Sequence, residues 1–528
     1  MCKARERDRQ DFSMNDMATN PYDAVAYPGH AFSQTHPAHL ATIAHFHGMS
    51  PAPTAAMRVL ELGCGSGGNL IPMALQCPGA ELVGIDLSAR AIARAKAEAA
   101  ELGLSNVSFH HLDIMAVSAE LGRFDYILVH GVYSWVPEPV RQRILALFGE
   151  LLMPQGIAYV SYNALPGCRL RDLARDVMLY ETRDIDEPMA KVRAARAAIK
   201  RFAEATDAET FYGAALRERA RQIEEIPDNV LYHDDLNPGA RAFALHEVLA
   251  AAEPYGLQYL AEASFPNNFG GARAPAQQLL NAIPSDQPLR QEQSLDLLIG
   301  RCFRQTLLCR AEIALHRGFS RFELSPYHLA ANVREAEESD ERPGVRAFLF
   351  GDDVRLAVDL PQAKAALRAL SRAWPGSIRH GDLVAEVMEE VRDGIGPDLE
   401  RETARLNEAL TAIYRAGLLE INLEPHRLTT RISERPLASF LARRQALSGP
   451  HVTDLRHRAV ELDGVVVRKF VSLLDGTRTA PMLLDEINAF LTEAHASGRD
   501  VSGLPRQATA AEVEMHLNDV ARLALLAG

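Results

Sequence analysis

The sequence predicts an α/β protein, in which a Rossmann-like sheet with helical insertions is followed by C-terminal α+β winged-helix-like modules. Two observations predict the sheet. Five short apolar segments alternate with helical patterns between residues 58 and 161, and the first segment ends in a run of glycines. A third observation predicts the modules, because the pattern after residue 312 becomes strand, strand, helix, helix, short strand.

The first expected strand, Arg58–Leu62, leads into the glycine-rich turn GCGSGG and then into a helix over 69–75. A strand, a glycine turn and a helix N-terminus together present backbone N–H groups to a ligand. The carboxyl ends of the strands are therefore the expected site. The other expected strands of this part lie at 81–86, 106–112, 124–129 and 156–161, and a helix at 89–102 is expected to begin at Ser88 and end at Gly103.

The pattern becomes helical after the fifth strand, with long amphipathic segments at 169–182, 189–204 and 208–226. Strand character returns at Gly256–Glu262 and again at Phe303–Cys309. We expect these two segments to be the last two strands of the same sheet. The helical segments would then be inserted into the sheet domain rather than form a separate domain.

Composition narrows the class of protein. The chain has 528 residues, 47% of them hydrophobic, and a net charge of −13 that argues against broad nucleic-acid binding. The first residues lack the apolar segment of a signal peptide, and no apolar run is long enough to span a membrane. Six dispersed cysteines without metal-finger spacing are typical of a reducing compartment. We expect a cytoplasmic protein without membrane insertion.

The residues around the glycine turn limit the ligand. A P-loop needs a lysine after its glycines, and none follows here. Gly63, Gly65 and Gly67 form the pattern G-x-G-x-G, and Gly68 adds a fourth glycine. A dinucleotide-binding fold would want G-x-G-x-x-G, and a dinucleotide-binding or orphan Rossmann domain stays the alternative. Glu61 precedes the glycines, Asp86 ends the second expected strand, and Asp113 follows the third. Asp86 stands where a carboxylate reaches ribose hydroxyls.

This set of acids and glycines resembles the class I S-adenosylmethionine-dependent methyltransferases. The resemblance implies S-adenosylmethionine as cofactor and S-adenosylhomocysteine as product, with Asp86 at the ribose and Asp113 near the adenine amino group. A segment before the sheet is expected to cover the cofactor, although it could be a packing arm. The expected cofactor-binding residues are Glu61, Gly63, Cys64, Gly65, Gly67, Asn69, Asp86, Leu87, Asp113, Ile114, His130 and Gly131, with Tyr27, Thr35 and His36 from that segment.

Unusual segments narrow the resemblance. NPYDAVAYP at 20–28, HGVYSWVPEPV at 130–140, YVSYNALPG at 159–167 and SERPLASFLARRQA at 433–446 are similar to one bacterial group. These are methyltransferases with a methyltransferase regulatory domain, typified by the protein-lysine methyltransferases of rickettsial outer-membrane protein B. The resemblance implies in-line methyl transfer to lysine in a protein, which could be a surface protein before export, and it leaves a homodimer open.

Domain boundaries follow from the pattern and the resemblance together. We expect a disordered tail over 1–19, a cofactor-binding methyltransferase core over 20–167, a helical insertion or regulatory region that completes the sheet over 168–310, a middle winged-helix-like domain over 311–424 and a C-terminal winged-helix-like domain over 425–528.

Candidate catalytic residues stand after the fourth and fifth strands, where the acceptor should lie. They are His130, Tyr133, Trp135, Tyr162 and Asn163. Aromatic rings at these positions could form a slot for an amine or alkyl-ammonium group, but Tyr133 and Trp135 could instead cap the core. His130 is expected to contact the cofactor's carboxylate rather than act as a base.

Two other clusters of polar residues are considered. Four histidines at 36, 39, 45 and 47 lack a cysteine or acidic ligand at zinc-like spacing, so no metal site is expected. The motif Tyr232–Asp235 could reach the site from the inserted helices or could simply begin a helix.

Three alternative functions stay open. The first is a methyltransferase for a small molecule, and the second is a winged-helix regulator that binds the cofactor without transferring its methyl group. The third, a nucleic-acid methyltransferase, is disfavoured by the acidic charge and by HGVYSWVP, which replaces an NPPY-type motif after the fourth strand.

Overall fold

The structure is a computed structural model, and it describes residues 25, 29–264, 274–284, 286–317, 323–337, 342–351, 354–394, 396–496 and 504–527. The expected N-terminal tail and Tyr27 lie outside the described residues.

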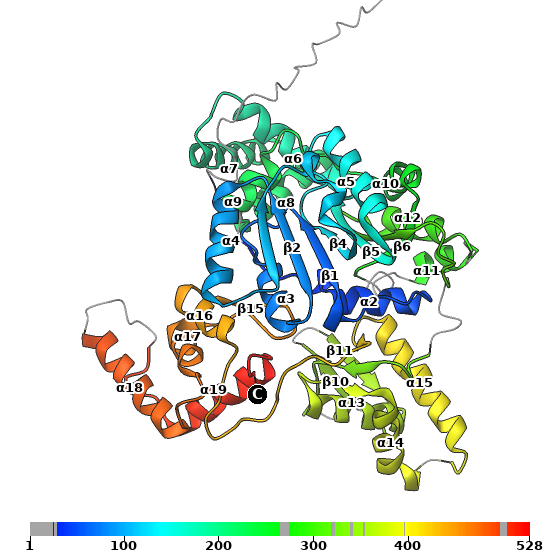
Figure 1. Ribbon diagram of the computed structural model, residues 1–528, viewed down its shortest axis with the longest axis vertical. Helices are drawn as coiled ribbons and strands as arrows, with labels where there is room; N and C mark the ends of the chain where they lie inside the picture. Colours follow the sequence, from blue (N-terminus) through cyan, green and yellow to red (C-terminus); the bar gives the residue numbers. More distant parts are fainter. Residues whose placement is uncertain are drawn as a thin grey trace, which may run out of the picture.

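A seven-stranded sheet forms the centre of the molecule, in the order β3-β2-β1-β4-β5-β7-β6 (Figure 1). The first five strands pair in parallel, whereas β7 runs antiparallel to both β5 and β6. The prediction of five parallel strands and of two later strands in the same sheet is confirmed. The strands are β1 Arg58–Leu62, β2 Glu81–Asp86, β3 Val107–His111, β4 Phe124–Val129, β5 Leu152–Asn163, β6 Leu257–Glu262 and β7 Phe303–Arg310.

The reversed direction of β7 makes the sheet mixed rather than purely parallel. Two helices, α11 (Ala274–Asn281) and α12 (Pro288–Ile299), connect β6 to β7 and do not cross to the other end of the sheet. The chain therefore enters β7 at the end where β6 finishes, and β7 must run backwards.

Helices cover both faces of the sheet, as the continuous apolar strands require. One face buries its strand side chains under α2, α3 and α4, and the other under α5 and α10. Ser88 caps α4 through its hydroxyl, as predicted. The helices are α2 Pro37–Phe46, α3 Leu70–Gln76, α4 Ala89–Glu101, α5 Glu138–Leu151 and α10 Leu245–Ala252.

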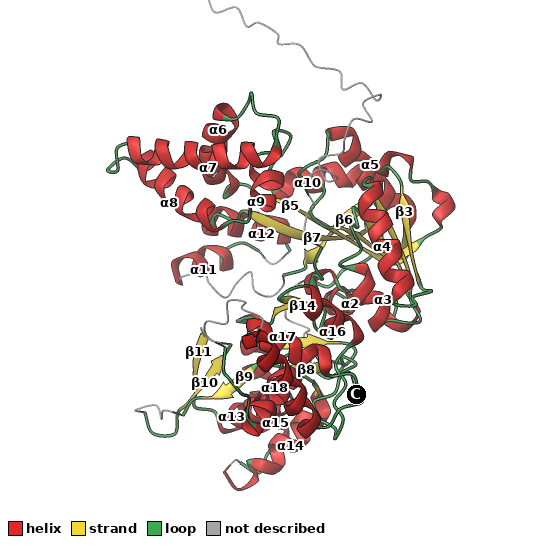
Figure 2. Cartoon of the chain, turned by 90° about the vertical axis from the view of Figure 1, so that its left-hand side faces the viewer, coloured by secondary structure: helices red, strands yellow, loops and turns green. Residues whose placement is uncertain are grey.

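The inserted helices form a bundle at one end of the molecule, with an apolar core of its own (Figure 2). The bundle contains α6 (Cys168–Glu181), α7 (Pro188–Ala205) and α8 (Phe211–Glu225), all within a few residues of the predicted bounds. A short helix α9 (Asp228–Val230) and a π-helical turn at Leu231–Asp235 lead back to the sheet domain.

Two smaller modules lie at the opposite end (Figures 1 and 2). The first contains an antiparallel hairpin of β10 and β11, with Gly351 at a positive φ of 56° in its turn. Its elements are β8 His328–Ala330, β9 Val333–Glu335, β10 Arg346–Phe350, β11 Val354–Val358, α13 Pro361–Ala373, β12 Ile378–Arg379, α14 His380–Glu390, α15 Leu399–Arg415 and β13 Glu420–Asn422.

The last module packs four helices and a two-stranded hairpin around one apolar core. Its elements are α16 Phe440–Ser448, β14 His451–Thr453, β15 Ala459–Glu461, α17 Gly464–Leu473, α18 Ala480–Ala496 and α19 Ala510–Arg522. Across the described ranges, no helix combines the length and the apolar character needed to cross a membrane.

Candidate functional site

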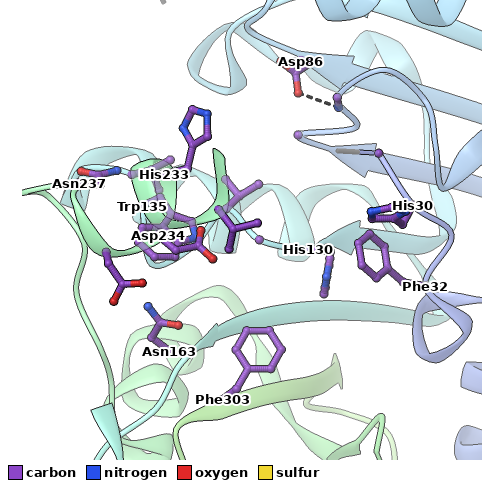
Figure 3. A pocket seen from close by; sticks show the side chains of 18 of the residues that line it. His30, Phe32, Asp86, His130, Trp135, Asn163, His233, Asp234, Asn237 and Phe303 are labelled. Carbon is purple, nitrogen blue, oxygen red and sulfur yellow. Dashed lines mark hydrogen bonds between the residues drawn. The ribbon is translucent and has the colours of Figure 1, made fainter. Parts of the chain in front are cut away.

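A cavity of about 1140 Å³ opens at the carboxyl ends of the parallel strands. One wall comes from the glycine turn and the strand ends, and the other from α6, α8 and the π-helical turn (Figure 3). The predicted site residues that line it are Glu61, Gly63, Cys64, Gly65, Asn69, Asp86, Leu87, Asp113, Ile114, His130, Gly131, Trp135 and Asn163.

Asp86 and the glycine turn hold each other in place. The Gly65 N–H donates to Asp86 Oδ2 at 2.8 Å, and the Ser88 N–H donates to Asp86 Oδ1 at 2.8 Å. Gly65 has a φ of +53°, which glycine adopts without strain. The carboxylate at the end of β2 is therefore fixed beside the turn, where the sequence places the ribose.

Glu61 lines the cavity, and its carboxylate is buried. Its Oε1 accepts a hydrogen bond from Asn69 Nδ2 at 2.9 Å, whereas Oε2 is buried and has no hydrogen-bond partner among the described residues. Burial raises the pKa of this carboxyl to about 7. Such a group is stabilised by a cationic ligand, so it fits the ammonium group of S-adenosylmethionine.

The rim near β3 is less buried. Asp113 is exposed, and its Oδ1 accepts a hydrogen bond from the Met115 N–H at 2.9 Å. Leu87 and Ile114 add apolar surface to the same part of the cavity. Apolar walls beside a carboxylate could hold a base and leave its amino group a partner. Taken together, the residues present fit the expected cofactor.

His130 lines the cavity beside Phe32 (Figure 3). Its ring packs on Phe32 at 4.1 Å between centroids, and its Nδ1 is 2.9 Å from the Tyr159 hydroxyl. Burial lowers the pKa of His130 to about 4, so the ring is neutral near pH 7. A neutral imidazole can donate a hydrogen bond but is a poor general base at that pH.

The far end of the cavity holds two of the five candidate catalytic residues, Trp135 and Asn163. Trp135 and Asn163 line it together with Phe303, and the Arg171 guanidinium lies 6.0 Å from the centre of the Trp135 ring. The Ser134 hydroxyl accepts a hydrogen bond from the Asn163 N–H at 2.8 Å, which holds the end of β5 in place.

The predicted aromatic slot is not formed by the two tyrosines. Tyr133 and Tyr162 are 2% and 1% exposed and belong to the core beneath the cavity. Tyr133 packs edge-on against Phe243, and the Tyr162 hydroxyl bonds to Thr306 Oγ1 at 2.9 Å. Since successive residues of a strand face opposite sides, Asn163 reaches the cavity and Tyr162 cannot. Trp135 alone of the three lines the cavity.

Three predicted cofactor-binding residues lie behind the wall rather than in it. Thr35 is fully buried and donates a hydrogen bond to the Phe32 carbonyl. His36 caps α2 by accepting the Ala38 N–H at 3.2 Å. A Cβ on Gly67 would meet Phe109 at 2.8 Å, so this glycine serves close packing of the turn. The segment before the sheet reaches the cavity through other residues, His30 and Phe32.

The π-helical turn brings charged side chains that the sequence left undecided. His233, Asp234 and Asp235 line the cavity. Asp235 pairs with Arg171 at 2.7 Å, whereas the described residues place no ion-pair partner within 4 Å of Asp234. Burial raises the pKa of Asp234 to about 6. His30, Phe32, Asn237 and Phe303 also line the cavity and had no signal in the sequence.

Metal binding has no support in this geometry. Across the described ranges, no group of three or more His, Cys, Asp or Glu side chains is arranged to hold a metal ion. His39 and His47 instead bond to the carbonyls of Ala263 and His316 at 2.5 and 2.8 Å.

The strand order, the glycine turn and the acids at the ends of β1 and β2 define an S-adenosylmethionine-dependent methyltransferase. Three family models match: "Methyltransferase domain" over 53–220, "Predicted methyltransferase regulatory domain" over 227–310 and "PKMT, C-terminal winged helix domain" over 434–525. The chain belongs to this family of methyltransferases with a regulatory domain and a PKMT-type winged-helix domain.

Relatives match along most of the chain. The uncharacterized protein RP789 of Rickettsia prowazekii is 30% identical over 480 residues, which cover 89% of this chain and 85% of that protein. The structure of PKMT2 from Rickettsia typhi superposes with a TM-score of 0.84 at 26% identity, covering 95% of this chain and all of that one. The structure of PKMT2 in complex with AdoHcy gives a TM-score of 0.83 at 25% identity. The predicted fold and family are therefore confirmed.

Proposed function

We propose that this methyltransferase transfers a methyl group from S-adenosylmethionine to lysine side chains of a protein, as the family's PKMT name denotes. One observation carries the proposal: a single cavity joins the buried carboxylate of Glu61 at one end to Asp234 and Trp135 at the other. A carboxylate beside an aromatic face suits an alkyl-ammonium group. The likeness to PKMT2 over nearly the whole chain supports the same acceptor.

The cofactor supplies a methyl group activated by its sulfonium. The chain's own residues then have three tasks: to hold the amine, to align it and to exclude water. Asp234, with a pKa of about 6, is ionised near pH 7 and attracts the lysine ammonium. After the lysine ammonium has lost a proton to water, the carboxylate accepts an N–H hydrogen bond from the neutral amine and so leaves the nitrogen lone pair free to face the cofactor end. Trp135 and Phe303 shield this step from solvent.

The proposal is tested by methyl transfer from labelled S-adenosylmethionine into proteins of a strain that lacks this enzyme. Labelled bands are hydrolysed and analysed for methyl-lysine, which is the expected product. If only small molecules carried the label, the methyl acceptor would be a metabolite and not a protein. Binding of S-adenosylhomocysteine without any transfer would identify a regulator that senses the cofactor.

Replacing Asp234 tests the acceptor side. Asp234→Asn is expected to lower kcat/KM for the protein substrate about 10- to 100-fold, because one charge-assisted hydrogen bond is lost. Affinity for S-adenosylhomocysteine should not change. Asp184→Asn, at a highly exposed aspartate of the same insertion, is the control. Equal kcat/KM values for the two variants would remove Asp234 from the acceptor site.

The raised pKa of Glu61 predicts a pH dependence of cofactor binding. A cationic ligand favours the ionised carboxylate, so binding below pH 7 requires that Glu61 lose a proton. Affinity for S-adenosylhomocysteine should rise about tenfold from about pH 6 to pH 7.5 and then level off. Calorimetry measures this. The Glu61→Gln variant should bind S-adenosylhomocysteine more weakly, and its affinity should not change between about pH 6 and pH 7.5. If the variant kept the pH dependence of wild type, another group would be its source.

The finer expectations on partners and location belong to the same proposal. The substrate would be a surface or outer-membrane protein that is methylated in the cytoplasm before export, and a homodimer stays open. A net charge of −13 suits a lysine-bearing partner and disfavours nucleic acid. We also propose that residues 311–424 form a second winged-helix-like module, which α13, α14, α15 and the β12-β8-β13 sheet support.

A further inference from the structure

A histidine of the C-terminal module reaches the wall of the cofactor cavity. His457 lies in the turn between β14 and β15 and is 1% exposed. Its Nε2 is 2.8 Å from Oδ1 of Asn69, the residue that follows the glycine turn and lines the cavity. The two residues are 388 positions apart in the sequence. The methyltransferase core and the winged-helix module therefore share one buried hydrogen bond.

The contacts of Asn69 fix which way its amide points. Oδ1 accepts hydrogen bonds from the Phe32 N–H at 3.1 Å and from His457 Nε2. Nδ2 then donates to Glu61 Oε1 at 2.9 Å and to Thr35 Oγ1 at 3.0 Å. A flipped amide would place its NH₂ against two donors and its oxygen against a carboxylate. His457 thus helps to keep the Asn69 amide on Oε1 of Glu61, the residue whose Oε2 has no hydrogen-bond partner among the described residues.

The backbone of the turn is held in an unusual conformation. His457 has a φ of +60°, which is uncommon for residues other than glycine, although asparagine, aspartate and histidine adopt it more often than the rest. Asp454 stabilises the turn, because its Oδ1 accepts the N–H groups of Arg456 and Arg458 at 2.9 and 2.8 Å. Its carbonyl also accepts a hydrogen bond from Gln76 on α3 at 3.3 Å. The strain is maintained because the surroundings fix the turn on several sides.

The middle module anchors the same turn. The buried guanidinium of Arg456 pairs with Glu420 and donates to the Pro375 carbonyl. It also lies 4.6 Å from the centre of the Trp374 ring. The turn over 454–458, which belongs to the C-terminal module, therefore contacts both the methyltransferase core and the middle module.

From these contacts we infer that His457 is a positioning residue for cofactor binding, through which the docked C-terminal module completes the Glu61–Asn69 site. The proposal rests on the assigned cofactor site and not on the lysine acceptor. Burial lowers the pKa of His457 well below its usual value, so the ring stays neutral and Nε2 carries the proton that Asn69 accepts. Among the described residues Nδ1 has no hydrogen-bond partner.

A pair of substitutions separates positioning from backbone support. Glutamine places an N–H donor near the position of Nε2, whereas asparagine places its amide near Nδ1 and cannot reach Asn69. Asparagine nevertheless tolerates the positive φ better than glutamine does. If His457 positions Asn69, the His457→Gln variant should bind the cofactor more tightly than the His457→Asn variant. If His457 only supports the backbone, the His457→Asn variant should fold better and should bind at least as tightly as the His457→Gln variant.

The measurement is the Kd of S-adenosylhomocysteine by calorimetry, with the ligand-free unfolding midpoint of each full-length variant alongside. His457→Asn is expected to raise the Kd about tenfold, because it leaves Asn69 short of one buried donor, and His457→Gln should stay within about threefold of wild type. The control is the His495→Asn variant, because His495 is an exposed residue of α18. Equal Kd values for the asparagine variant and wild type, or Kd values that only follow the midpoints, would overturn the inference. A wild-type protein that fails to bind would instead refute the cofactor site itself.

Discussion

Gly65→Arg is expected to abolish cofactor binding, with a Kd for S-adenosylhomocysteine at least about 100-fold higher than that of wild type. A Cβ at Gly65 would have no heavy atom within 4 Å, so a long side chain would extend into the open cavity. It would occupy the space between Glu61 and Asp86 that the cofactor needs. The arginine would also pair with these carboxylates and remove them from the ligand. Calorimetry measures the loss.

The control for this substitution is Gly103→Arg. Gly103 also has a positive φ, +66°, and also has open space around its Cβ position, but it is exposed after α4 and does not line the cavity. Both variants thus carry the same backbone strain, and only one fills the cavity. Gly103→Arg should bind normally with a slightly lower unfolding midpoint. Normal binding by Gly65→Arg would show that the cofactor lies elsewhere.

Arg304→Met is expected to give the largest loss of stability, about 3–5 kcal/mol in the free energy of unfolding. Arg304 is completely buried on β7 and pairs with Glu262, with Asp296 at 2.8 Å and with Glu292 at 3.1 Å. Removing the guanidinium leaves three carboxylates in the core with too few cations. Methionine fills a similar volume, so the loss reports charge rather than a cavity. Urea unfolding followed by circular dichroism measures it.

The same substitution at an exposed ion pair is the control. Arg372 pairs with Glu386 at 2.7 Å, and both side chains are largely exposed to solvent, which screens the pair. Arg372→Met should therefore leave the unfolding free energy almost unchanged. If the two variants lost equal stability, the buried cluster would have no special role. The cluster ties β6, β7 and α12 together, so its loss should also loosen the edge of the sheet beside the cavity.

The cavity explains why the helical region is inserted into the sheet domain. The core alone supplies the turn, Glu61 and Asp86, which form the cofactor end. The π-helical turn after α8 supplies Asp234 and Asp235 at the other end of the cavity. A segment that follows β5 begins at this edge, where β5 ends, whereas a module added after β7 would begin at the opposite edge. The connection therefore places the regulatory helices over the strand ends.

Local pattern was enough to predict most of the central sheet. β2 and β4 begin and end where their apolar runs do, because strands buried on both faces must be continuously apolar. The acids Glu61 and Asp86 were also found from sequence, since each stands at the end of an apolar strand and Glu61 directly precedes the glycine turn. Contacts between neighbours in the chain carry this information.

Side-chain direction and long-range contacts required the three-dimensional structure. Tyr162 and Asn163 are adjacent, yet the first packs in the core and the second lines the cavity, because the pleat of β5 alternates and no local pattern shows which face is inside. The antiparallel direction of β7 depends on where α12 delivers the chain. His457 and Asn69 meet only because three modules dock on one turn. Such contacts depend on the packing free energy between segments that are far apart in the chain, and this free energy cannot be read from local patterns in one sequence.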